Sequence, residues 1–413
     1  MKPRDRQLVA LDIGSSKVAA LICEARETGR IDLRGTGVVE SKGFRRDTLV
    51  HLEAAVEAIR QAVESAEAVA GLPIETAVVG VSGAHIRSLN SRGGVSLGPR
   101  PREVESEDIR RAIDAARSVS LPPDQELLHV LPQEFLLDQQ NGIHDPLGLL
   151  GRRLEVNVHI VTAAAAATRN LVGAVNRAGV VVQDTVLEPL AAAEACLTPD
   201  ERALGVVLVD AGAGGTNWIT FQEGAPRDSG LVPVGGEHFT QDIAVGLSAP
   251  LWEAERIKRA YGCASLRQVG QDALFEVASV GERPPRLTSR RALVEIIEPR
   301  ALEWTALLRE GLERSCGGQV SRSFGAGLVL TGGAAGLDGL AELTAHELRL
   351  PVRLGLPKGL AGATATLSSP ACASAVGLVL HADRLWRARS RRGGGLVYRL
   401  RNLLAGRAGA AGV

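Results

Sequence analysis

The pattern of apolar and polar positions predicts alternating strands and helices, and two stretches repeat one plan. In "LVALDIGSSKVAALICEA" (8–25) and "GVVLVDAGAGGTNWITFQEG" (205–224), an apolar strand leads into Asp-x-Gly, small residues and a second apolar strand. Two unrelated hairpins with glycine turns are the alternative, but each copy opens one half of the chain. The repeat therefore favours an α/β protein built from two duplicated halves with a cleft between them.

The segment from 47 to 71 is a long predicted helix. Asp47 can cap its start and Gly71 can end it. Its aliphatic residues recur at the spacing of one helix face, and they are Leu49, Leu52, Val56, Ile59 and Val63.

Between about 84 and 162 the pattern changes to short alternating segments and one charged helix. In "LEVNVHIV", the apolar side chains of Leu154, Val156, Val158 and Ile160 fall on one face of a strand. This stretch predicts a small α+β domain inserted into the first half of the chain.

We expect six parts along the chain. They are subdomain 1A (1–83 plus 163–200, with a closing helix at 370–385), the inserted α+β subdomain (84–162), subdomain 2A (201–235 plus 325–369), a helical subdomain 2B (236–324), a basic, glycine-rich linker (386–395) and an amphipathic helix (396–406).

Composition argues against nucleic-acid binding, a zinc or disulfide framework, and a membrane-spanning segment. The formal net charge of the 413 residues is zero, so there is no global electrostatic case for binding nucleic acid. The five cysteines form no Cys-x-x-Cys pair, which argues against a zinc site or a disulfide framework and fits a reducing cytosol. We expect neither a signal peptide nor a spanning helix, because no stretch approaches roughly 18 uninterrupted apolar residues.

Each Asp-x-Gly copy can present backbone N–H groups to a phosphate, because no side chains stand in the way. Taken alone, either motif is weak evidence for this, since a glycine turn is usually only a turn. Asp12 and Asp210 would face a Mg²⁺ ion through its water shell. The candidate phosphate contacts are Gly14, Ser15, Ser16 and Lys17 in the first copy, and Gly212, Ala213, Gly214 and Gly215 in the second.

Three further motifs fit a nucleotide site, and each has a structural alternative. "VLTGGAAGLDGL" (329–340) can admit a flat ligand at Gly332, Gly333 and Ala334, or it can be a tight strand–helix connection. Glu255 and Lys258 lie on one helix face, where a solvated ion pair is the alternative.

Glu188 opens a predicted helix after a strand. It is either a carboxylate at a helix start or an acid near an attacking water.

In this order the motifs resemble the actin, heat-shock chaperone and sugar-kinase superfamily. Segments such as "HVLPQEFLLDQQNGIHDPLGLLGRRLEVNVHIVTA" and "VEIIEPRALE" further resemble the FtsA family of bacterial cell-division proteins, over about residues 7–382. The resemblance implies an actin-like, duplicated two-lobed α/β fold, with ATP or ADP in the cleft between the lobes.

The same resemblance implies self-association into filaments that attach the tubulin-like ring protein FtsZ to the inner face of the cytoplasmic membrane. The C-terminal peptide of FtsZ would dock on 236–324, where Arg300 is one candidate contact. Later division proteins would bind through the inserted subdomain.

The C-terminal segment predicts a short amphipathic helix for an anionic membrane surface. Leu396, Val397, Leu400, Leu403 and Leu404 share an arc of roughly 120° on a helical wheel. Arg399 and Arg401 lie outside that arc. The alternatives are a helix docked on the protein's own core, and disorder. Because five aliphatic side chains bind weakly, we expect tails on a filament to act together.

The second loop departs from the superfamily pattern Asp-x-Gly-x-Gly-Thr-x-Asp. Gly215 stands at the threonine position and Asn217 at the second aspartate. A hydroxyl and a negative charge are lost, so we expect nucleotide to bind but turn over slowly. The alternatives are a pilus-assembly relative that binds a membrane-protein peptide, and a sugar or acetate kinase. Neither accounts for the C-terminal helix.

Overall fold

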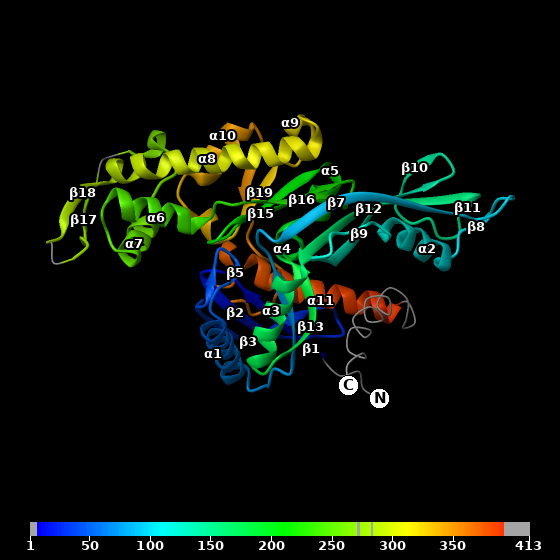
Figure 1. The fold of residues 1–413 in the computed structure, drawn as a ribbon, viewed down its shortest axis with the longest axis horizontal. Coiled ribbons are helices and arrows are strands. Elements are labelled where there is room, and N and C mark those ends of the chain that lie inside the picture. The colour runs from blue at the N-terminus through cyan, green and yellow to red at the C-terminus, as the bar shows by residue number, and fades with distance from the viewer. Residues whose placement is uncertain (1–5, 271–272, 282–283, 392–413) are drawn as a thin grey trace.

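The computed structural model describes residues 6–270, 273–281 and 284–391. Two lobes lie one above the other, and the chain crosses between them through α4 and α11 (Figure 1). The inserted domain and the helical subdomain extend from the upper lobe in opposite directions.

The first lobe is built on a five-stranded sheet with the order β13-β6-β1-β2-β3. β1, β2 and β3 pair antiparallel, whereas β6 and β13 extend the sheet in parallel. The strands are β1 (Arg6–Ile13), β2 (Lys17–Ala25), β3 (Ile31–Glu40), β6 (Thr76–Val81) and β13 (Val181–Leu187).

The second lobe repeats this topology in a sheet with the order β16-β15-β14-β19-β20. Three antiparallel strands are again followed by two parallel ones, and β14 corresponds to β1. The duplication predicted from the two Asp-x-Gly copies is therefore confirmed. The strands are β14 (Val206–Ala211), β15 (Thr216–Gln222), β16 (Ala225–Val232), β19 (Leu328–Thr331) and β20 (Val352–Leu354).

Helix α1 (Leu52–Ala70) covers the first sheet and ends at Gly71, as predicted. The predicted cap at Asp47 is wrong, because the Nδ1 atom of His51 accepts the capping hydrogen bond from the N–H of Ala54. Asp47 instead lies in a short hairpin before the helix, made by β4 (Phe44–Arg45) and β5 (Thr48–Leu49).

The inserted domain pairs four strands in the order β10-β9-β12-β7 and packs α2 against them. The predicted inward-facing residues of β12, from Leu154 to Ile160 at every second position, are all fully buried. Its elements are β7 (Ile86–Ser96), β8 (Arg102–Glu103), α2 (Ser106–Arg117), β9 (Gln125–Leu137), β10 (Gln140–Ile143), β11 (Leu150–Gly151) and β12 (Arg153–Ala164).

The inserted domain also touches the second lobe at its edge strand β16. Ser88 Oγ donates to the carbonyl of Ser229 at 2.7 Å, and the buried His159 lies 2.9 Å from Ser229 Oγ through Nε2. Arg227 pairs with Glu134 at 3.4 Å. These contacts hold the insert, which belongs to the first lobe in sequence, against the second lobe in space.

The helical subdomain packs α6 and α7 around the long helix α8, with Phe239, Trp304 and Leu308 in its core. A hairpin of β17 and β18 closes its outer end. The remaining elements of the second half are α6 (Gly236–Gly246), α7 (Leu251–Tyr261), β17 (Leu274–Val277), β18 (Arg286–Ser289), α8 (Arg290–Cys316), α9 (Val320–Ser323) and α10 (Leu340–Leu348).

Two helices, α4 (Glu188–Cys196) and α11 (Ala373–Arg391), cross where the lobes meet. A Cβ atom at Gly377 would overlap with the carbonyl oxygen of Ala191, so the two backbones are nearly in contact. The facing residues are mostly alanines, which permit this approach. The lobes are thus joined by a tight helix pair. Helices α3 (Ala165–Arg177) and α5 (Pro199–Leu204) flank α4 in the chain.

The closing helix is longer than predicted. α11 continues to Arg391, so the first part of the segment expected to be a linker from 386 is helical. Arg387 pairs with Asp383 one turn earlier at 2.6 Å, and the Arg6 guanidinium stacks 3.9 Å from the ring centre of Trp386. These contacts stabilise the extra turns. The predicted amphipathic helix, 396–406, lies outside the described residues.

Candidate nucleotide-binding site

The two Asp-x-Gly loops approach each other where the lobes meet, a place called the gap below, and each loop is closed by the same kind of hydrogen bond. The N–H of Gly14 donates to the carbonyl of Lys17 at 3.0 Å, and the N–H of Gly212 donates to the carbonyl of Gly215 at 2.9 Å. A Cβ atom at Gly214 would lie 2.6 Å from Ser15 Oγ of the first loop. Glycine is therefore required at 214 by the close approach of the loops.

Buried carboxylates gather at the base of this gap. Asp12 and Asp210 are each the second-last residue of their strands, β1 and β14, and Glu188 begins α4. All three are at most 8% exposed. Ser374 Oγ, at the start of α11, donates to Asp210 Oδ2 at 2.6 Å. Glu188 Oε1 has no hydrogen-bond partner among the described residues. The three predicted acids are thus brought together by both lobes and by both crossing helices.

Burial dominates the electrostatics of these acids. It raises the pKa of Asp210 to about 6, and it raises the pKa of Asp12. Burial and the nearby charge of Asp12 raise the pKa of Glu188 well above its usual range. Desolvated carboxylates of this kind are stabilised by an added cation.

The residues present fit a hard divalent cation held through water. Within the part of the chain that the structure describes, no three His, Cys, Asp or Glu side chains converge as direct metal ligands. The unpartnered Oε1 of Glu188 and the buried Asp12 and Asp210 can accept hydrogen bonds from water bound to Mg²⁺, which retains several waters in proteins. When bound, such an ion neutralises phosphate charge.

Lys17 lies at the edge of the gap rather than between the loops. Its Nζ atom donates to the carbonyl of Ala371 and lies 3.3 Å from Cys372 Sγ, just before α11. The charge of Lys17 still opposes the rise in the pKa of Asp12. Ser16 is exposed at the turn, and its carbonyl accepts from the N–H of Ser41 at 3.0 Å.

The Glu-x-x-Lys pair is half-buried and makes further hydrogen bonds, so the solvated ion pair is the weaker interpretation. Lys258 Nζ lies 2.6 Å from Glu255 Oε2, and the lysine side chain is only 14% exposed. It also donates to the carbonyl of Gly236 at 2.9 Å. A Cβ atom at Gly236 would lie 3.5 Å from the Cβ of Ala334 and 3.7 Å from the carbonyl oxygen of Gly212. Gly236, at the start of α6, therefore adjoins Lys258, the second phosphate loop and the 332–334 turn.

The glycine turn after β19 is tighter than a simple strand-to-helix connection. Gly332 has a φ of 89°, and Gly333 begins a 3₁₀ turn (Gly333–Gly336) rather than an α-helix. The N–H of Gly332 donates to the carbonyl of Pro370 at 3.1 Å, in the segment that leads into α11. The turn therefore lies beside the start of the closing helix.

The departures in the second loop have clear structural consequences. Asn217 lies opposite Asp210 in the β14–β15 pair and is buried. Thr216 cannot replace the missing phosphate-loop hydroxyl, because its Oγ1 donates to the carbonyl of Val234 at 2.7 Å and accepts from Trp304 Nε1 at 2.8 Å. Trp218 packs into the core of the second lobe.

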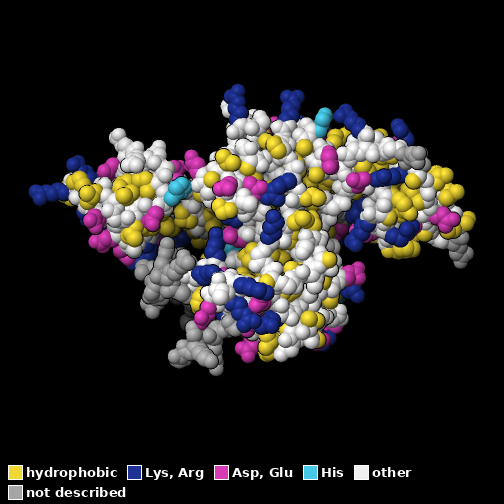
Figure 2. Space-filling model, turned by 180° about the vertical axis from the view of Figure 1, so that it is seen from behind, with side chains coloured by type: hydrophobic (Ala, Val, Ile, Leu, Met, Phe, Trp, Pro, Cys, Tyr) yellow, Lys and Arg dark blue, Asp and Glu magenta, His cyan; other side chains and the backbone are white. Residues whose placement is uncertain are grey.

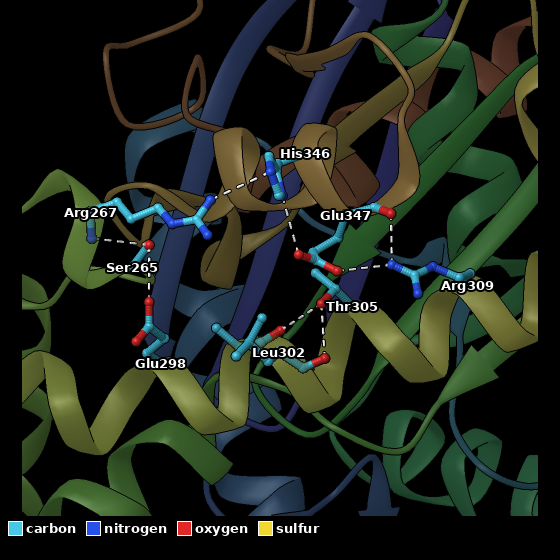
Figure 3. Close-up of polar contacts among 9 residues, drawn as sticks. Ser265, Arg267, Glu298, Leu302, Thr305, Arg309, His346 and Glu347 are labelled. Atoms are coloured by element: carbon cyan, nitrogen blue, oxygen red, sulfur yellow. Dashed lines mark hydrogen bonds and ion pairs between the residues drawn. The ribbon is translucent and has the colours of Figure 1, made fainter.

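Arg300 lies outside the cleft, on the side of α8 that faces α6. Its Nε and Nη2 atoms donate to Asp242 at 2.6 and 3.1 Å, and it also pairs with Glu303. The opposite side of α8 carries a separate polar network with α10 and the 265–267 turn (Figure 3). There Ser265 Oγ donates to Glu298 at 3.0 Å and Arg309 donates to Glu347 at 2.9 Å.

Sequence reasoning missed two residues of the gap. Ser374 was hidden in an alanine-rich helix start, and only the fold brings it to Asp210. Asp47 accepts from Ser15 Oγ at 2.7 Å, beside the second loop. The two arginines that precede Asp47 and the apolar residues that follow it resembled an ordinary helix start, so the sequence carried no signal for its true position.

Comparisons with known proteins settle the family. A model described as "SHS2 domain inserted in FTSA" matches residues 83–162, and one described as "Cell division protein FtsA" matches residues 207–377. The FtsA of Pseudomonas aeruginosa is 43% identical over 376 residues, which cover 91% of this chain and 89% of that relative. The chain belongs to the FtsA family of cell-division proteins.

Other comparisons agree with this assignment. The FtsA of Escherichia coli K12 is 38% identical over 92% of this chain and 91% of that relative. Among solved structures, a PilM–PilN type IV pilus biogenesis complex matches with a TM-score of 0.66 at 19% identity, over 92% of this chain and 99% of that one.

MreB5 of Spiroplasma citri bound to ADP matches with a TM-score of 0.56 at 13% identity, over 95% of this chain and 100% of that one. The predicted actin-like fold with a small inserted domain is confirmed, and so is the predicted FtsA resemblance.

The raised pKa of Asp210 predicts a pH-dependent stability. Its folded pKa of about 6 lies above the ordinary 3.8, so the folded protein binds more protons and loses stability as pH rises from about 4 to above 6. Asp210→Asn should therefore stabilise the nucleotide-free protein by about 3 kcal/mol at pH 8, with little gain at pH 4.

Chemical denaturation at both pH values measures this difference. Asp200→Asn, at an exposed position on α5, is the matched control and should leave the profile unchanged. A parallel shift of stability at pH 4 and pH 8 for Asp210→Asn would contradict the assignment.

Proposed function

We propose that this protein is a nucleotide-bound, membrane-attached polymer that connects FtsZ to the cytoplasmic face of the inner membrane at the division site. The observation that supports nucleotide binding is the pair of matching loops that face each other over buried carboxylates, one of which has an oxygen without a hydrogen-bond partner among the described residues. The bound molecule would be ATP or ADP with Mg²⁺. The ADP in MreB5, which shares the fold, is consistent with this proposal.

In the proposed complex, each loop has a defined task. The N–H groups of 15–16 and 213–215 contact the phosphates, while those of Gly14 and Gly212 close the two loops. Asp12 and Asp210 orient the water shell of Mg²⁺. The adenosine lies between the 332–334 turn and the half-buried Glu255–Lys258 pair. Glu188 is the acid closest to a position from which water could attack.

We expect slow hydrolysis, because Gly215 supplies no hydroxyl and Asn217 no charge, and Thr216 is held in the core. Phosphate release in saturating MgATP should be at least tenfold below the ~1 s⁻¹ at the lower end of typical enzymes. A rate well above that limit, abolished by Asp210→Ala, would contradict a structural role for the nucleotide.

Self-association is supported by apolar side chains at both ends of the long axis. Figure 2 shows hydrophobic residues gathered over the inserted domain and over the helical subdomain. At the tip of the insert, Leu147, Leu149 and Leu150 are 53%, 42% and 67% exposed. On the outer face of the β17–β18 hairpin, Leu274 and Leu287 are each 67% exposed. Contacts between opposite ends of successive molecules would produce an open filament.

Membrane attachment is assigned to the C-terminal segment 396–406 on its sequence pattern. None of the helices in the described ranges is long and apolar enough to cross a membrane. Full-length protein should sediment with anionic liposomes, and a 1–392 truncation should not, because it lacks the apolar face together with Arg399 and Arg401.

The liposome experiment has two internal controls. Neutral liposomes should retain less full-length protein, and circular dichroism should show that the truncation is folded. Equal sedimentation of the two chains with anionic liposomes would contradict a role for the tail.

The FtsZ tail peptide is assigned to the helical subdomain, with Arg300 as a contact. Two carboxylates orient its guanidinium, yet its Nη atoms carry further N–H groups that can donate to a peptide. The opposite side of α8 is less suited, because its polar groups satisfy one another (Figure 3).

Arg300→Glu should weaken binding of an FtsZ C-terminal peptide at least tenfold in fluorescence anisotropy, because it reverses the charge at the contact. Arg314→Glu, at an exposed position further along α8, is the matched control and should bind normally. Unchanged peptide affinity in a folded Arg300→Glu protein would exclude this contact.

A further inference from the structure

The hairpin of residues 43–49 crosses from the first lobe into the gap between the phosphate loops. Arg46 and Asp47 form its tip, and their φ angles are 49° and 58°. Positive φ at both central residues is what a two-residue hairpin turn of type I′ requires, although arginine is an unusual residue there. A Cβ atom at Gly214 would lie 2.7 Å from the Cα of Arg46, so the tip reaches the second lobe.

The Asp47 side chain fills the space between the two loops. Asp47 Oδ1 accepts a hydrogen bond from Ser15 Oγ at 2.7 Å, and the backbone N–H of Asp47 donates to Ser15 Oγ at 2.7 Å. On the side of the second loop, a Cβ atom at Gly214 would lie 2.8 Å from Asp47 Oδ1, and a Cβ atom at Gly215 would lie 3.5 Å from Asp47 Oδ2. The carboxylate therefore touches both elements that are suited to hold phosphate.

No cation accompanies this carboxylate in the described part of the chain. Lys17 Nζ is directed to the carbonyl of Ala371, and no ion pair to Asp47 is formed there. The charged groups that face Asp47 from other elements are mainly acidic, and they are Asp12, Glu188, Asp210 and Glu237. A nucleotide phosphate would meet Asp47 both as an obstacle and as a like charge.

We propose that Asp47 occupies the position of a nucleotide phosphate, and that the tip of the 43–49 hairpin must leave the gap before a nucleoside triphosphate can bind. This inference rests on the proposed nucleotide site. Asp47 is then an internal competitor that lowers the apparent affinity of the cleft, because only the withdrawn state can bind.

The base of the hairpin is built to remain in place while the tip moves. The carbonyl of Gly43 accepts from the N–H groups of Val50 and His51 at 2.8 and 3.0 Å, which closes the base. Arg45, Arg46 and Thr48 are exposed, so few contacts apart from those of Asp47 hold the tip. Nucleotide binding would separate Asp47 from Ser15 and from the second loop.

Replacing Asp47 by glycine tests the competition directly. Asp47→Gly removes the carboxylate, and glycine adopts the same φ without strain. Its affinity for MgATP, measured by equilibrium dialysis, should rise at least tenfold over wild type. Asp47→Asn retains an acceptor for Ser15 but removes the charge, so its affinity should lie between the two. Glu223→Gly changes an exposed acid with a φ of 51° far from the cleft and should equal wild type.

The outcomes separate this inference from the nucleotide proposal. If wild type binds MgATP and Asp47→Gly binds no tighter, the inference fails while the nucleotide site stands. If neither protein binds MgATP, both fail. In wild type, hydrogen exchange of the amides of 44–49 should accelerate on addition of MgATP. Unchanged or slower exchange with bound nucleotide would overturn the withdrawal of the hairpin.

Discussion

The near-contact of α4 and α11 is the interaction on which the rest of the structure depends. Because Gly377 has no side chain, the carbonyl of Ala191 can approach its backbone, and the two crossings between the lobes become one packed unit. Both helices begin at the gap. α4 places Glu188 there, and α11 places Ser374 against Asp210. The same helix pair thus joins the lobes and positions polar groups from both of them.

This geometry imposes an electrostatic cost at the place where the loops meet. Asp12, Glu188 and Asp210 are removed from water, and Asp47 adds a fourth carboxylate in contact with Ser15. A protein that gained nothing from a cation or an anion at this place would have little reason to bury them together. The slow turnover expected from Gly215 and Asn217 suits a ligand that determines the arrangement of the lobes, with hydrolysis secondary.

Much of this architecture was predictable, because the duplicated Asp-x-Gly pattern specifies strand pairing locally. Glycine and alternation signals also identified the insert and the end of α1 at Gly71. The positions of Asp47 and Ser374 were not predictable, since each depends on contacts with residues far away in the chain. The length of α11 was underestimated because Trp386 is stabilised by Arg6, from the other end of the sequence.

The most direct test of the central claim is negative-stain electron microscopy of the protein on anionic lipid monolayers with MgATP, with and without an FtsZ C-terminal peptide. We expect filaments on the lipid that require both nucleotide and residues 393–413, and that bind the peptide. Protein that binds MgATP and lipid but remains dispersed as single molecules under all these conditions would contradict that claim.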